Sequence, residues 1–272
     1  MKGKISTLVI ANENEEKLFL AALVQVLTNG YLRHADRNVQ VSMREEGSEV
    51  LYGDEDIKAA MKASADASEI TVKNAAQSPD NIPESLELAV RSEQTFCGRI
   101  LFTTKEIDEP DSVIIIAGSE EITDLPSRIA NTGDAHFTLL IRKDLPESEV
   151  ISGKVGMALG GRQFSTFAYS PYGFMSDGSA RTAENASPHG IEEIFWNAAS
   201  DAAKHRTEKL SAIIAESEKM IGLRAGTYQK KSPRRQMELN YSRRIYAEAA
   251  REIFAAEQLA ALAGGEPLAY EK

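Results

Sequence analysis

The feature that most constrains this fold is a pair of long amphipathic patterns in the last third of the chain, each opening with Ser-Pro. Serine is a favoured N-cap residue and proline suits the first helical position, so each dipeptide predicts a helix start. The apolar stripe after Ser187-Pro188 comprises Ile191, Phe195, Ala198, Ala202, Ile213 and Met220, and glycines follow at 222 and 226. The stripe after Ser232-Pro233 comprises Tyr241, Ile245, Ala249, Ile253, Ala256 and Ala260, before Gly264-Gly265. The sequence therefore predicts antiparallel helices over 188–222 and 233–263.

The length of these helices has a consequence for the whole molecule. A helix of about 30 residues is roughly 45 Å long, which exceeds the width of a small domain. Part of the predicted hairpin, assigned to residues 188–272, should therefore project from the rest of the protein or pack against another subunit.

The first predicted unit, residues 1–76, alternates strand and helix patterns. Residues 4–10 are rich in β-branched side chains, and a helical stripe follows from Leu18 to Leu27. Residues 39–44 and 49–52 have the pattern of a β-hairpin, Asp54 is a candidate helix cap, and residues 69–73 form a further strand pattern. The order β-α-β-β-α-β is that of ferredoxin-like domains, and a mixed-sheet α/β body is the alternative.

Residues 77–187 are predicted to form a second α/β segment, which gives the chain an α/β (α+β) fold class. Pro83 predicts a helix that carries Leu86, Leu88, Ala89 and Val90. Strands are predicted at 99–102, 112–116 and 136–141, and short helices at Pro126 and Pro146. The strand at 112–116 is apolar throughout, as expected for a central strand that is covered on both faces.

A stretch rich in glycine and aromatic residues, 152–187, is the candidate ligand-binding loop. It is predicted to hold one strand, 163–169, within a long loop, and loops of such length are often functional. The candidate pocket residues combine ring surfaces with polar groups: Arg162, Tyr169, Tyr172, Asp177 and Arg181. The alternation of aromatic residues between Phe164 and Tyr169 favours simple packing of a sheet face over a ligand site.

No motif identifies an enzyme. The chain lacks G-x-G-x-x-G, the P-loop, G-x-S-x-G, paired C-x-x-C and H-E-x-x-H. His189 and His205 are 16 residues apart, about 160° around a helix, so they are not predicted to share a metal ion. No cofactor, metal or catalytic residue is assigned, and whether the chain is an enzyme stays open.

Basic residues gather around the predicted hairpin turn. They are Arg224, Lys230, Lys231, Arg234, Arg235, Arg243 and Arg244, and Glu238 is the one acidic residue among them. Cations near the end of the first helix suit its dipole, and Arg244 can pair with Glu248. Positive charge at the start of the second helix is unfavourable, however. We therefore expect an acidic surface, either a protein partner or a phosphate backbone, to be bound by Lys230, Lys231, Arg234 and Arg235, with Arg243 and Arg244 as further binding residues.

Composition limits the cellular setting and the partners. A single cysteine, Cys97, fits a reducing compartment, and no apolar run reaches the 18 to 20 residues of a membrane span, so a cytoplasmic location without membrane contact is expected. A net charge of −10 disfavours binding of nucleic acid over the whole surface, although a local basic patch could still touch phosphates.

Three functions are consistent with these patterns. The leading one is a non-catalytic assembly subunit that oligomerises, or docks to a protein partner, through its C-terminal hairpin. The first alternative is an enzyme or small-molecule-binding protein that uses the loop 152–187. The second is a subunit of a nucleic-acid complex that contacts phosphates through the basic turn of the hairpin.

Overall fold

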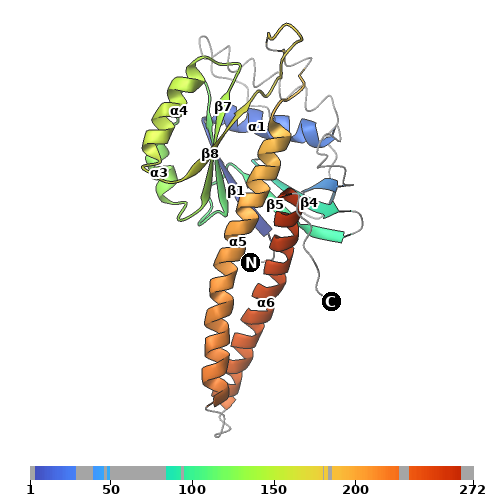
Figure 1. Cartoon of the computed structure of the whole chain (residues 1–272), viewed down its shortest axis with the longest axis vertical. Coiled ribbons are helices and arrows are strands. Elements are labelled where there is room, and N and C mark those ends of the chain that lie inside the picture. The colour runs from blue at the N-terminus through green and yellow to red at the C-terminus, as the bar shows by residue number, and fades with distance from the viewer. Residues whose placement is uncertain are drawn as a thin grey trace.

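A single mixed sheet forms the body of the protein, and a long helical hairpin leaves it (Figure 1). The computed structural model describes residues 4–28, 39–45, 48–49, 84–92, 95–179, 181–182, 186–226 and 233–264. Within these residues the strands are β1 (Lys4–Ile10), β2 (Val39–Glu45), β3 (Ser48–Glu49), β4 (Ser85–Ser92), β5 (Thr95–Thr103), β6 (Ser112–Ala117), β7 (His136–Arg142) and β8 (Phe164–Tyr169). The helices are α1 (Glu13–Thr28), α3 (Leu125–Ala130), α4 (Glu147–Ala158), α5 (Ile191–Gly226) and α6 (Pro233–Gly264).

The strand order is β3-β2-β4-β5-β1-β6-β7-β8. Strands β5, β1, β6, β7 and β8 run parallel, whereas β2, β3 and β4 form antiparallel pairs. Of the two architectures expected for the body, the structure has the mixed sheet, because β1 pairs with β5 and β6, both later than residue 76. The helix predicted from Asp54 and the strand predicted at 69–73 lie outside the described residues.

Strand β6 confirms the prediction of a central strand covered on both faces. All six of its residues are buried. Ile114 and Ile116 face the layer of α1, α5 and α6, whereas Val113 and Ile115 face α3 and α4. The two hydrophobic cores of the body therefore meet at this strand, one on each side of the sheet.

The segment after Pro83 corrects the sequence prediction, because residues 85–92 form strand β4 and not a helix. Leu86, Leu88 and Val90 are buried at a spacing of two residues. Between them, Glu87 pairs with Lys4 at 2.5 Å on the partly exposed face. This alternation is the period of a strand, and it outweighs the helix-start signal of the proline.

The predicted loop 152–187 also needs correction at its beginning. Residues 152–158 belong to α4, where Ile151 and Val155 pack on the sheet. The glycines at 153 and 156 lie within this helix and do not end it. Strand β8, at Phe164–Tyr169, confirms the strand predicted within the stretch.

The hairpin is confirmed in both of its helices. Helix α5 has 36 residues and α6 has 32, which correspond to about 54 and 48 Å. The half of α5 nearest the sheet buries four alanines, Ala198, Ala199, Ala202 and Ala203. Above them Phe195 stacks on Phe102 of β5 with ring centroids 5.8 Å apart. Small side chains let the helix approach the sheet closely, and the distal half of the hairpin extends beyond the body (Figure 1).

The apolar stripe predicted for the hairpin is only partly buried. Leu210, Leu239 and Ala249 lie in the seam between the helices. Ile213, from the stripe predicted for α5, and Tyr241, from the stripe predicted for α6, are 41% and 66% exposed. Two helices without a third neighbour cover a narrow strip of each other, and the small residues Ser217 and Ser242 fill part of it.

Leu259 provides a test of how firmly α6 is held on the body. Its side chain is fully buried in the main core, next to Gly98 of β5. We expect Leu259→Ala to lower the free energy of unfolding by about 2 to 5 kcal/mol, because truncation leaves a cavity. The control Met157→Ala, at a side chain on α4 that is 76% exposed, should change it by no more than about 0.5 kcal/mol. Equal effects in urea unfolding would contradict the packing of α6 on the sheet.

Candidate functional sites at the sheet edges and on the hairpin

The residues of the predicted ligand pocket lie at several separate places. Arg162 precedes β8, where its guanidinium lies 5.1 Å from the ring centroid of Phe137 and donates to the Gly133 carbonyl oxygen at 3.2 Å. Tyr169 ends the same strand, so the two side chains stand at opposite edges of the sheet. The structure therefore does not bring Arg162 together with the tyrosines.

Asp177 and Arg181 make local contacts within the loop that follows β8. The Asp177 carboxylate is exposed and accepts hydrogen bonds from the backbone N–H and the hydroxyl of Ser179, which lower its pKa. The Arg181 side chain donates to the carbonyl oxygen of Phe174 at 2.9 Å. These bonds shape the loop.

Tyr169 and Tyr172 lie beside a buried group of charges at the carboxyl edge of the sheet, which we call the carboxyl-edge cluster: Glu15, Arg142 and Asp144. Arg142 ends β7 and donates to Glu15 of α1 at 2.7 Å and to Asp144 at 3.2 Å. All three side chains are no more than 5% exposed. The guanidinium also lies 5.8 Å from the ring centroid of Tyr172.

The charges of this cluster depend on one another. Burial opposes the positive charge on Arg142, but the Glu15 and Asp144 carboxylates outweigh it and raise the pKa of the guanidinium. Burial raises the pKa of Glu15, and Arg142 acts in the opposite direction. Burial, with Glu15 nearby, also raises the pKa of Tyr169, so its hydroxyl keeps its proton at neutral pH.

The cluster is packed tightly against the end of β6. A Cβ atom on Gly118 would lie 2.6 Å from Cγ of Glu15, so only glycine leaves room for this carboxylate side chain. Arg142 ends β7, Asp144 follows it, and Glu15 lies in the first turn of α1 after β1. The sequence prediction missed these residues because no motif marks them. The ion pair between Arg142 and Glu15 holds α1 against the end of β7, so the cluster acts as a structural clamp.

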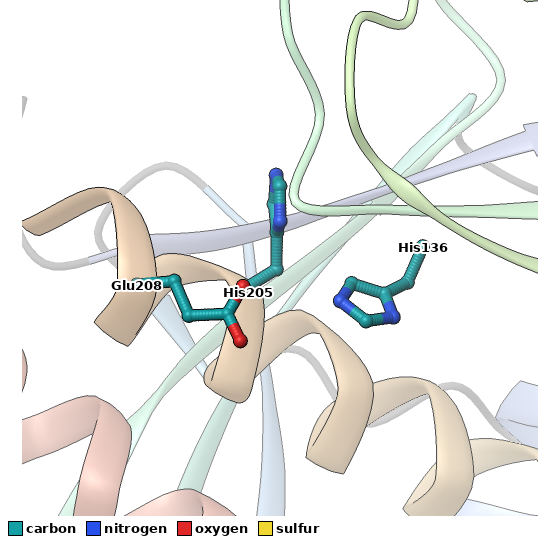
Figure 2. A group of neighbouring side chains, drawn as sticks. All are labelled: His136, His205 and Glu208. Carbon is teal, nitrogen blue, oxygen red and sulfur yellow. The ribbon is translucent and has the colours of Figure 1, made fainter.

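A second group of titratable side chains lies at the opposite, amino edge of the sheet. This histidine cluster consists of His136 at the start of β7 and of His205 and Glu208 on α5 (Figure 2). Its three candidate ligand atoms, one from each residue, lie within 4.8 Å of one another. The two imidazole rings meet edge to face, with centroids 5.3 Å apart. The sequence prediction did not pair these histidines, because 69 residues separate them.

Next to the histidine cluster, Arg206 fastens the hairpin to the body. Its guanidinium donates to Glu252 of α6 at 2.7 Å and lies 3.9 Å from Oδ1 of the buried Asp111. The other oxygen of Asp111 accepts from the backbone N–H of Ser6 at 2.9 Å. One charged chain of contacts thus links α6, α5 and strand β1.

A cavity of about 1070 Å³ opens beside the first turns of α5. Its lining includes Phe167, His189, Gly190, Glu193 and Trp196, together with Val26 of α1 and Ala263 of α6. The volume is that of a small-molecule site, and part of the wall comes from the end of the predicted loop 152–187. Of the five predicted pocket residues, none lines this cavity.

The distal hairpin exposes both apolar and basic side chains. Met237 and Tyr241, one helical turn apart on α6, are 72% and 66% exposed. Arg243 and Arg244 are also exposed, and Arg244 pairs with Glu248 at 2.8 Å, as its spacing predicts. Lys230 and Lys231 lie outside the described residues, as do the side chains of Arg234 and Arg235, so the contact predicted for the turn stays a prediction.

Arg142 provides the test of the carboxyl-edge cluster. Arg142→Met should lower the free energy of unfolding by about 3 to 5 kcal/mol, since it leaves two buried carboxylates without their cation. Lys154→Met is the control, because Lys154 pairs with Glu121 on the surface and such pairs contribute about 1 kcal/mol or less. A loss in chemical denaturation no larger than that of the control would show that the cluster is not a clamp.

None of the helices in the described part of the chain is long and apolar enough to cross a membrane. Comparison with models of known protein families, with curated proteins and with solved structures finds no match to this chain.

Proposed function

We propose that this protein is a non-catalytic assembly subunit whose distal hairpin pairs with the hairpin of a second copy. The observation that carries the proposal is the exposure of Met237 and Tyr241 on one face of α6, in the part of the hairpin that extends beyond the body (Figure 1). Large apolar side chains that lie exposed one turn apart on a helix are typical of a helix-packing surface.

The shape of the hairpin favours a copy of itself as the partner. Two antiparallel hairpins that pack side by side form a four-helix bundle, in which each pair gains the neighbours that a lone hairpin lacks. A two-fold arrangement uses the same surface twice, so one exposed stripe on each chain is sufficient. Ile213 of α5, at 41% exposure, adds apolar area on the distal half.

The hairpin is also held in a way that suits a docking element. Its base is fixed by the buried alanines of α5 and by the contacts of Arg206 with Glu252 and Asp111. A surface that is rigid before association loses less conformational entropy when it binds. The basic residues around the turn lie in a chain of net charge −10 and would suit an acidic surface on the partner copy.

The proposal predicts that charged residues on this face separate the copies. The double variant Met237→Lys, Tyr241→Lys should weaken self-association by at least about tenfold, because it would bury two unpaired charges in the interface. Sedimentation velocity over a range of protein concentrations measures the effect, with circular dichroism as the check on folding.

The matched control is Val150→Lys, Met157→Lys on α4, where the two side chains are 65% and 76% exposed. It introduces the same charges at equally exposed apolar positions on the body and should leave association unchanged. A wild-type protein that stays monomeric, or a control that dissociates as readily as the hairpin variant, would contradict the proposal.

Two other functions remain as alternatives. The cavity beside α5 favours a small-molecule-binding protein, with its mixed lining of Phe167, Trp196, His189 and Glu193. The basic turn favours contact with phosphates in a nucleic-acid complex. Native mass spectrometry distinguishes the three functions. A dimer without added mass supports assembly, and a monomer that carries a small added mass supports small-molecule binding in the cavity. A bound oligonucleotide supports contact with phosphates.

A further inference from the structure

The histidine cluster at the base of the hairpin has the composition of a metal site. It presents two imidazole nitrogens and one carboxylate oxygen, the donor set that zinc takes in sites with three protein ligands and a water. His205 is 5% exposed, His136 is partly buried and Glu208 is exposed. The cluster therefore has a buried floor and an open side by which an ion could enter.

One nitrogen of the His205 imidazole, Nε2, is buried and has no hydrogen-bond partner among the described residues. A buried polar atom without a partner costs about 1 to 3 kcal/mol, so such atoms are rare unless something else binds them. One nitrogen of His205, one nitrogen of His136 and a carboxylate oxygen of Glu208 lie within 4.8 Å of one another.

The nearby cations do not compete for these ligands. Arg206 is already engaged by Glu252 and Asp111, and Lys209 lies 3.7 Å from the carboxylate of Glu109.

We propose that His136, His205 and Glu208 bind one divalent transition-metal ion of the zinc class. The ligand atoms of a tetrahedral zinc site lie about 3.3 Å apart, given metal–ligand bonds near 2.0 to 2.1 Å. The separations in the structure, all within 4.8 Å, would shorten toward that value when the ion binds. Histidine nitrogen with carboxylate oxygen favours zinc over calcium or magnesium, which prefer oxygen ligands alone.

The ion would have a structural consequence that does not depend on the proposed self-association. Two of its ligands come from α5 and one from β7, so binding would fasten the hairpin to the sheet at a second point beside Arg206. An ion that binds only the folded protein raises its thermal stability.

The test is calorimetric titration of Zn²⁺ into tag-free protein that has been treated with a chelator and then freed of it. We expect the wild type to bind one ion per chain. His136→Gln and His205→Gln should each weaken binding by more than about 100-fold, because even an outer-shell partner contributes 10- to 100-fold. Glu208→Gln should weaken it by at least about tenfold, and none of the three variants should gain thermal stability from zinc as the wild type does.

The controls are His189→Gln, at an exposed histidine outside the cluster, and Glu216→Gln, at an exposed glutamate two turns further along α5. Both should bind zinc as the wild type does. Replacement of zinc by Co²⁺ should give visible absorption bands of tetrahedral cobalt in the wild type and not in the His136 variant. If His205→Gln does not fold, the two less buried variants decide the question. Absence of one-to-one binding, or wild-type affinity in His136→Gln and Glu208→Gln, would overturn the assignment.

Discussion

Close packing of the alanine-rich base of α5 on one face of the sheet is the contact on which the rest of the arrangement depends. Ala198, Ala199, Ala202 and Ala203 are fully buried there, and Phe195 and Trp196 continue the contact toward the start of the helix. Because α6 packs along α5 and reaches β5 through Leu259, this contact sets the direction in which both helices leave the body. A hairpin directed away from the sheet then exposes its distal side chains.

The two edges of the parallel strands carry charges of different character. At the carboxyl edge, Arg142 forms buried ion pairs with Glu15 and Asp144, in a packed interior where Gly118 leaves room for the Glu15 side chain. At the amino edge, His136, His205 and Glu208 approach one another from two elements, and Nε2 of His205 has no hydrogen-bond partner among the described residues. In the first arrangement the opposite charges pair within the protein, whereas the second has the donor set of a metal site.

The sequence predicted the parts of the fold in which local signals and tertiary packing agree. The apolar stripes predicted both hairpin helices, and the unbroken apolar run at 112–116 predicted the central strand. Pro233 begins α6 as predicted, whereas α5 begins at Ile191, three residues after Pro188. Strand β4 was missed because Pro83 resembles a helix start, although the alternation of Leu86, Leu88 and Val90 contradicts it. The histidine cluster could not be predicted, since only the pairing of β6 with β7 and the crossing of α5 bring His136 near His205.

The most direct measurement of the central claim, that the distal hairpin is an interface between copies, is hydrogen–deuterium exchange as a function of protein concentration. If the account is right, amides around 237–245 of α6 become more protected as concentration rises from about 1 to 100 μM, whereas those of α4 do not change. Exchange in α6 that is independent of concentration over this range, with the protein folded throughout, would contradict it.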